Sequence, residues 1–246
     1  MKARSWLAAT VLGALLSPAV SRAEGLEGRF SITFQGGTQS ELSGDLLKGT
    51  TGTIFNGKTV TLDSKRYRDV YEPDLRLQGL LGYGISERVE IIARGTYYKA
   101  NGTALEVGRL EDVPIYAFFD PYGEYEEVGA ELGLRLYIAA AGRMKSYVAP
   151  IVGARWLTET YVTFEVPDAG SAIRNVPFHE KSTVPVFGLD LGFTFDLGEH
   201  FFVGVDTGLR YQTAPSQANG LPGLEQIDDS DGKWSSPVAA SIGIRF

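Results

Sequence analysis

The sequence predicts an all-β chain that folds into a single eight-stranded antiparallel, transmembrane up-and-down barrel. Three observations lead to this fold. Apolar and polar residues alternate with a period of two along almost the whole chain, which is the pattern of strands. Glycine is abundant at 30 of 246 residues, aromatic residues make up 11 %, and cysteine is absent. The connections between the predicted strands alternate strictly between short and long.

The composition excludes several other classes of protein. Without cysteine, the chain is neither a disulfide-stapled domain nor a thiolate metal protein or cysteine enzyme. A net charge of −7 argues against nucleic acid as a partner, because nucleic-acid binders present a basic face. A mean hydropathy of −0.05 is too polar for a bundle of membrane helices.

The first 23 residues predict a secretory signal peptide. A basic start is followed by an apolar run from Trp6 to Leu16, and small residues at the −3 and −1 positions precede Glu24. An anchor helix would need about 20 apolar residues, and this run is much shorter. We therefore expect cleavage between Ala23 and Glu24, which leaves residues 24–246 as one barrel domain.

Eight strands are predicted in the mature chain, and each has one apolar face. The opposite face carries glycine, serine, threonine and charged residues. The predicted strands are residues 29–35, 74–83, 89–98, 130–138, 146–161, 187–195, 201–211 and 238–246.

The connections differ in length at the two ends of the predicted barrel. Three are tight, at residues 85–88, 140–145 and 198–200, and four long ones cover residues 36–73, 100–124, 167–181 and 213–234. Outer-membrane barrels sort their connections in this way, with short periplasmic turns and long extracellular loops. Both chain ends then lie on the periplasmic side. Within the first long loop, residues 53–62 predict a β-hairpin around Asn56-Gly57.

The charged face predicts what fills the barrel. An eight-stranded barrel is only wide enough for side chains to fill, so we expect acids and arginines to pair across strands and plug the lumen. Asp190 and Arg210, on neighbouring strands, are expected within reach of each other. The alternative, a wet face on a soluble sheet, fits the aliphatic and aromatic stripes less well. The predicted lumen set is Arg76, Glu90, Arg94, Glu131, Arg135, Arg155, Asp190, Asp196, Asp206, Arg210 and Arg245.

Aromatic residues fall into two bands about one strand length apart, as expected at two membrane interfaces. Tyr97, Trp156 and Tyr211 lie near the long-loop ends. The short-turn ends carry Tyr83, Phe195, Phe201 and Phe246.

The C-terminal segment Ser-Ile-Gly-Ile-Arg-Phe resembles the assembly signal of Gram-negative outer-membrane barrel proteins. Those proteins end in an aromatic residue, here Phe246, with apolar residues two and four positions earlier, here Ile244 and Ile242. Residues 79–90 and 198–205 resemble periplasmic hairpins of the same class.

This resemblance covers nearly all of residues 28–246 and is to the small OmpA- and OmpX-like barrels. It implies an outer-membrane location, contact with outer-membrane lipid and lipopolysaccharide, and insertion by the barrel-assembly machinery. It implies no particular function, because a fold hosts many functions.

Candidate chemistry is sparse, since the chain has two histidines that the topology places at opposite ends. Outer-membrane lipases, acyltransferases and lipid A deacylases resemble this chain in topology and use a serine, a histidine and an acid. For His179 the nearby candidates are Ser182 or Ser171 with Glu180 or Asp168, but no fixed spacing favours them. We expect His179 to be a solvated loop residue.

Neither a metal nor a cofactor is expected. The acidic run Asp228–Gly232 lacks the spacing and closing glutamate of a calcium loop, so it is interpreted as solvated. The sequence thus predicts a non-enzymatic, structural or surface-interaction barrel with a charge-plugged lumen and no identified extracellular ligand. Two alternatives are a narrow channel for small or apolar solutes and a lipid-modifying outer-membrane hydrolase.

Overall fold

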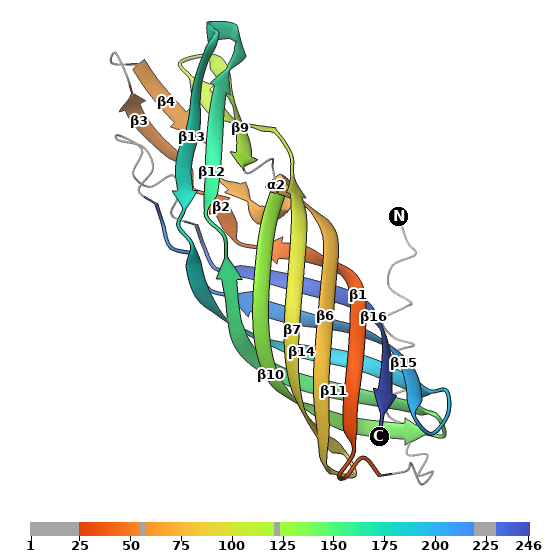
Figure 1. Ribbon diagram of the computed structural model, residues 1–246. Coiled ribbons are helices and arrows are strands. Elements are labelled where there is room, and N and C mark those ends of the chain that lie inside the picture. Colours follow the sequence, from red (N-terminus) through yellow and green to blue (C-terminus); the bar gives the residue numbers. More distant parts are fainter. Residues whose placement is uncertain (1–24, 55–57, 121–123, 219–229) are drawn as a thin grey trace.

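The computed structural model describes residues 25–54, 58–120, 124–218 and 230–246. The predicted signal peptide, with its cleavage site at Ala23 and Glu24, lies outside these ranges and stays a prediction. The described chain is almost entirely strand and forms a closed barrel with a further sheet beyond one end (Figure 1). None of its described helices is long and apolar enough to cross a membrane.

Eight antiparallel strands close the barrel in the order β1-β16-β15-β14-β11-β10-β7-β6, which confirms the predicted fold. Strands that follow one another along the chain are neighbours in the barrel and are joined alternately by long connections and short turns, and β1 pairs with β16 to close the wall. The barrel strands are β1 (Phe30–Ser43), β6 (Tyr71–Ser86), β7 (Val89–Gly102), β10 (Glu124–Ala141), β11 (Met144–Leu157), β14 (Ser182–Asp196), β15 (Phe201–Gln212) and β16 (Lys233–Arg245).

Most of these strands are longer than the alternation predicted, because they continue beyond the membrane-spanning part. The predicted strand 146–161 is wrong at its end: β11 stops at Leu157, and Tyr161 belongs to a different sheet. Thr158 and Glu159, both exposed, separate the two strands.

The long connections build a second, six-stranded antiparallel sheet in the order β13-β12-β9-β8-β4-β3, which the sequence did not predict as a unit. The predicted hairpin of the first long loop is β3–β4, and its Asn56-Gly57 turn lies outside the described residues. The sheet consists of β3 (Thr50–Ile54), β4 (Lys58–Leu62), β8 (Leu105–Leu110), β9 (Val113–Asp120), β12 (Thr160–Val166) and β13 (Ser171–His179).

Short elements connect the sheet to the barrel. The strands β2 (Asp45–Leu47) and β5 (Lys65–Arg66) pair with each other, and helix α2 (Tyr67–Val70) leads into β6. The 3-10 turn η1 (Pro167–Ala169) joins β12 to β13. Figure 1 shows this six-stranded sheet rising from the barrel end opposite the short turns.

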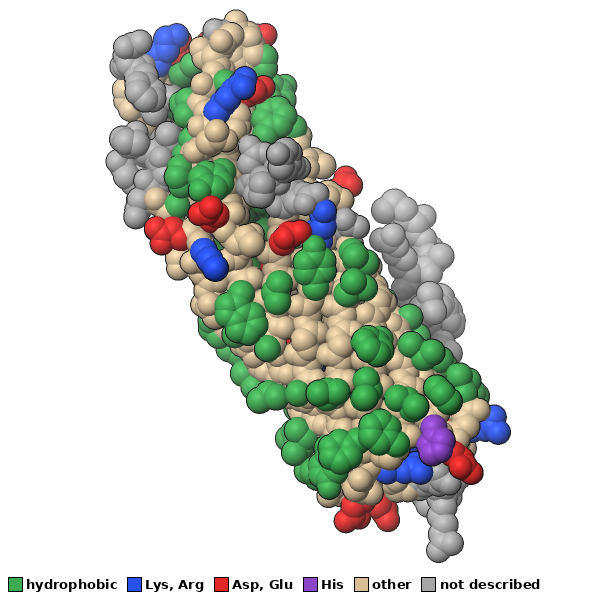
Figure 2. All heavy atoms as spheres, viewed as in Figure 1, with side chains coloured by type: hydrophobic (Ala, Val, Ile, Leu, Met, Phe, Trp, Pro, Cys, Tyr) green, Lys and Arg blue, Asp and Glu red, His purple; other side chains and the backbone are tan. Residues whose placement is uncertain are grey.

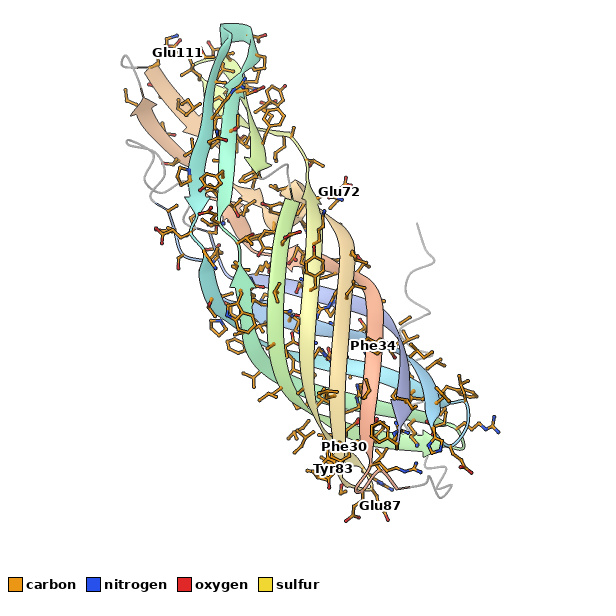
Figure 3. The ribbon with its side chains drawn as sticks, viewed as in Figure 1. Phe30, Phe34, Glu72, Tyr83, Glu87 and Glu111 are labelled. Atoms are coloured by element: carbon orange, nitrogen blue, oxygen red, sulfur yellow. The ribbon has the colours of Figure 1, made fainter. Side chains whose placement is uncertain are left out.

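The outer wall of the barrel is an apolar belt. Phe34 is 66 % exposed and Leu132 is 61 % exposed, and aliphatic and aromatic side chains cover the wall between the two ends (Figure 2). Charged side chains appear above and below: Glu72 lies beyond the belt and Glu87 lies in a short turn (Figure 3). A lipid bilayer is the environment that such an exterior requires.

The dimensions of the belt match a membrane. Trp234 near the start of β16 and Phe246 just after its end are both exposed and lie twelve positions apart in the sequence. A rise of about 3.3 Å per residue and a strand tilt of about 45° place them about 28 Å apart along the membrane normal. At the lower edge the Phe30 ring packs against those of Tyr83 and Phe246, at centroid distances of 4.7 and 6.4 Å.

Candidate functional site: the closed lumen

The structure places ten of the predicted lumen residues on the inner wall, each no more than 7 % exposed; Asp196 also faces inward, at the short-turn rim, and is less buried. The cause is the strand period of two, which sends alternate side chains to the same face. Register then decides which charges meet: Arg94 lies opposite Glu131, and Arg135 lies opposite Glu90, on adjacent strands. Directly opposed charges on one face are the pairs that stabilise a sheet.

Glu131 is the centre of the charged network. Its Oε2 accepts a hydrogen bond of 3.1 Å from Arg94 Nη1, and its Oε1 accepts one from Arg155 Nη2. Arg210 Nε lies 3.7 Å from the same Oε1. Three guanidinium groups, from β7, β11 and β15, therefore share this one carboxylate.

Asp190 forms the second centre. Arg210 binds it through both terminal nitrogens, at 2.5 Å from Oδ1 and 2.8 Å from Oδ2, and Arg94 Nη2 lies 2.9 Å from Oδ2. This two-pronged geometry suits a planar guanidinium and a carboxylate. Asp190 and Arg210 thus lie on one inner wall and bind each other.

Closer to the short turns, Glu90 is held by a separate group of partners. Its Oε2 accepts hydrogen bonds from Arg135 at 2.8 Å and from the Tyr137 hydroxyl at 3.1 Å, while Ser31 donates to Oε1. The Arg135 guanidinium also lies 4.5 Å from the centre of the Tyr147 ring. Burial is tolerable for these charges because they are paired.

The remaining charges complete the network at both ends. Arg245 and Lys145 bind Asp196 at 3.2 and 2.8 Å near the short turns. Arg76 donates a hydrogen bond to the side-chain carbonyl of Gln39. When the Gln78 amide is oriented so that both its oxygen and its nitrogen find partners, its oxygen accepts two further hydrogen bonds from Arg76. Sequence reasoning missed Lys145 because its position next to a turn was assigned to the connection.

Inward glycines make room for these long side chains. A Cβ at Gly129 would lie 2.6 Å from Arg155 Nη1, and a Cβ at Gly82 would collide with the Glu90 carboxylate. Neither clash is relieved without moving a buried ion-paired group. At these two positions the lumen has no room for a larger residue.

An apolar layer closes the barrel mouth on the side of the short turns. Leu26, only 3 % exposed, packs in a cluster with the inward residues Leu80, Ile92 and Tyr137, among others. Backbone hydrogen bonds hold the turn in place, from Gly28 N to Gly84 O at 2.8 Å and from Arg29 N to Leu26 O at 3.0 Å. Sequence alternation could not show this layer, because Leu26 precedes the first strand.

At the other mouth a buried lysine sits in an aromatic cage. Lys233, 2 % exposed, lies 2.8 Å from Glu127 and 3.3 Å from Glu41. Its ammonium is 4.3 Å from the Tyr125 ring centre and 4.9 Å from that of Tyr67. Sequence reasoning missed all of these residues, although the alternation from Lys233 to Val238 could have extended the last strand.

A hydrophobic core covers this lysine from above. It joins α2 and the six-stranded sheet to the upper ends of the barrel strands, and burial raises the pKa of Tyr67 to about 12. The core includes Leu46, Leu47, Val60, Leu62, Val70, Tyr71, Tyr98, Val107, Ile115, Phe119, Tyr125, Leu157, Val162, Phe164, Val176, Phe178 and Val184.

His179 is buried, so its interpretation as a solvated loop residue is wrong. It is 4 % exposed, and its Nε2 lies 2.7 Å from the Ser230 hydroxyl, which donates to the Leu46 carbonyl at 2.5 Å. Burial, together with the charge of Lys233, lowers the pKa of His179 to about 3. The contact fastens three long connections to one another.

The other candidate catalytic residues do not gather around His179 as one serine–histidine–acid site. Ser171 begins β13 while His179 ends it, a separation of about 26 Å in an extended strand. Asp168 lies in η1 at that same distant tip, and Glu180 is exposed. Ser182 begins β14, and its buried hydroxyl has no hydrogen-bond partner within the described residues. His200, at the opposite end of the barrel, lies 3.0 Å from the Arg245 carbonyl.

No group of three potential metal-ligating residues occurs among the residues that the structure describes. In the acidic run from Asp228 to Gly232, Asp228 and Asp229 lie outside the described ranges. Asp231 forms an ion pair of 3.3 Å with Lys48.

Known proteins resemble this chain in fold. No protein-family model and no curated protein matches the sequence. Ail of Yersinia pestis, solved with a heparin analogue, is 14 % identical with a TM-score of 0.41, over 89 % of this chain and 99 % of Ail. The outer membrane protein AlkL is 16 % identical with a TM-score of 0.47, over 94 % of each chain. OprG from Pseudomonas aeruginosa, another outer membrane protein, is 13 % identical with a TM-score of 0.40, over 91 % of this chain and 99 % of OprG.

The chain's own geometry defines its class. A closed antiparallel barrel with an apolar exterior, a charged interior and unequal connections at its two ends is a Gram-negative outer-membrane β-barrel. Its eight strands are the smallest number that such barrels use. In such barrels the short turns usually lie on the periplasmic side, so we expect the six-stranded sheet to lie outside the cell.

The buried histidine predicts a pH effect on the stability of the six-stranded sheet. Because the pKa of His179 is lower in the folded protein than the ordinary 6.5, the unfolded chain binds the extra proton as the pH falls. Stability is therefore complete above about pH 6.5 and decreases towards pH 3, by about 2 kcal/mol at pH 5. Thermal melting followed by near-ultraviolet circular dichroism, at about pH 7 and pH 5, measures this loss.

The matched variant is His179→Gln, which keeps a side chain able to bond Ser230 and does not titrate. We expect the wild type to lose more stability between the two pH values than the variant. An equal pH dependence in both proteins would show that His179 titrates without coupling to the fold.

Proposed function

We propose that this protein is a non-enzymatic, non-conducting barrel that anchors an extracellular β-sheet in the outer membrane for surface interaction. The observation that carries this proposal is the filled lumen, with Leu26 at one mouth, the network around Glu131 and Asp190 in the middle, and Lys233 under its apolar cover. A solute path would have to break ion pairs that are each deeply buried. The filled barrel is therefore a rigid platform for the six-stranded sheet.

The expected partners of the barrel are membrane components. The apolar belt contacts outer-membrane lipid, and the extracellular leaflet would supply lipopolysaccharide around the upper aromatic band. The barrel-assembly machinery would insert the chain through its C-terminal strand, which ends in Ile242, Ile244 and Phe246. The extracellular ligand of the sheet is not identified.

The arrangement of His179 supports a role other than hydrolysis. The neighbouring Ser230 hydroxyl is 5 % exposed and donates to a backbone carbonyl, so its proton is not directed towards the imidazole. A nucleophilic serine needs the histidine as its proton acceptor and an accessible substrate site. Mass spectrometry of lipid A from cells with and without the protein tests the hydrolase alternative, and a mass change that depends on the protein would favour it.

Planar-bilayer conductance tests the closed lumen. We expect no steady conductance from the wild type. Arg210→Ala should lower stability by about 3 kcal/mol, the lower end for a broken buried ion pair, because Asp190 and Glu131 both keep Arg94. It should also open a small leak.

The control is Leu209→Ala, the adjacent residue on β15, which faces the lipid. We expect it not to leak. A large steady conductance of the wild-type protein would exclude the plug and favour the channel alternative.

A further inference from the structure

A small cavity interrupts the packing of the charged network. Its polar wall is formed by Gln35, Gln78, Arg94, Asp190, Asp206 and Arg210, from β1, β6, β7, β14 and β15. The cavity has room for about one water molecule. It lies at the inner face of the barrel wall, and each of these six residues is at most 7 % exposed.

Three of the lining residues leave a polar atom without a hydrogen-bond partner among the described residues. These atoms are Asp206 Oδ1, Arg94 Nε and Arg210 Nε. The other Asp206 oxygen accepts a hydrogen bond from Gln35. Arg210 Nε lies 3.7 Å from a carboxylate oxygen of Glu131, which is too far for a hydrogen bond. Buried polar atoms are normally bonded to protein or to ordered water.

The wall beside the cavity explains why space remains there. The recorded pairing of β15 with β16 stops at Thr207–Val238 and resumes at Arg210–Ser235. Pro237, which lines the cavity, has no N–H with which to continue the ladder. Side-chain hydroxyls replace the missing bonds, from Thr207 to the Pro237 carbonyl at 3.1 Å and from Ser236 to the Gly208 carbonyl at 3.0 Å.

We propose that this cavity is a built site for one buried water molecule, which links Asp206 to Arg94 and Arg210. Among the described residues, the side chains that line the cavity carry two N–H donors and one carboxylate oxygen without a partner, so the occupant must both accept and donate hydrogen bonds. The two guanidinium groups disfavour a cation, and the carboxylates of Asp190 and Asp206 disfavour an anion. Water meets both conditions and the size limit.

The site completes the charged network. None of the ion pairs recorded among the described residues includes Asp206, although it shares the lumen with several arginines. The bridging water connects this carboxylate to two of them. The inference is separate from the proposed function: a conducting barrel with a single ordered water at this position would contradict that function and support this site.

High-resolution crystallography of the wild-type protein is the direct test. We expect a density peak within hydrogen-bonding distance of all three atoms. An Asp206 side chain bonded directly to an arginine, or a cavity without density at high resolution, would overturn the proposal.

Two variants on β16 test the site independently. Ala239→Val adds volume to a residue that lines the cavity, whereas Ala240→Val makes the same change on the outer face of the same strand. We expect Ala239→Val to lose the density peak and to melt at a lower temperature, and Ala240→Val to keep both. A persistent peak in Ala239→Val at the same position would also contradict the site. If Ala239→Val does not fold, the wild-type density decides.

Discussion

Replacement of Glu131 by glutamine is expected to destabilise the barrel by about 5 kcal/mol, the upper end for a broken buried ion pair. The substitution keeps the shape of the side chain but removes the only charge shared by Arg94, Arg155 and Arg210. Three buried guanidinium groups would then lie close together, and Asp190 would pair with two of them, Arg94 and Arg210. The cost is large because burial removes the water that would otherwise solvate these charges.

The control is Glu126→Gln on the same strand, which removes the same charge from the outer surface. Glu126 accepts a hydrogen bond of 2.9 Å from the Tyr97 hydroxyl, outside the lumen. We expect a loss of about 1 kcal/mol or less, because glutamine keeps a carbonyl oxygen that can accept the hydrogen bond from Tyr97. Urea titration of the protein in detergent, followed by its heat-modifiable migration, measures both variants. Equal stability losses would show that the network around Glu131 does not hold the barrel closed.

The inner face of the barrel could be predicted because a strand alternates strictly. Once Leu132 and Leu134 are assigned to the lipid, Glu131 and Arg135 must point the other way, whatever the register. Which charges meet is decided by register, and register depends on the turns. Asp190 and Arg210 could be placed on neighbouring strands because a tight turn joins those strands.

Other parts of the site depend on contacts that alternation does not contain. Leu26 enters the lumen from outside any strand, and Lys233 reaches its carboxylates from the first position of β16. His179 is buried because the end of β13 packs into the hydrophobic core that covers Lys233, to which Val176 and Phe178 belong. No local sequence pattern distinguishes the six-stranded sheet from long loops. Its strands are short, and their partners are distant in the sequence, as in β4 with β8.

Deletion of Phe246 is expected to reduce insertion into the outer membrane strongly while leaving export to the periplasm intact. In the folded barrel, the Phe246 carbonyl accepts a bond of 2.8 Å from Phe30, and its N–H donates one of 3.0 Å to Phe30. The deletion removes these two bonds and one ring contact, for a loss of about 2 kcal/mol in the folded state. A barrel closed by long ladders on every side tolerates such a loss.

The two possible causes of an assembly defect can therefore be separated. The truncated protein and the control Phe246→Tyr are refolded in detergent and, in parallel, expressed in cells whose outer-membrane fraction is assayed for heat-modifiable protein. We expect both to refold in detergent, and only the truncated protein to be depleted from the membrane while it accumulates in the periplasm. That result would assign the terminal aromatic residue to recognition during assembly, because folding itself is preserved. Failure to refold in detergent would assign it to closure of β1 on β16, and normal membrane levels of the truncated protein would contradict the assembly signal.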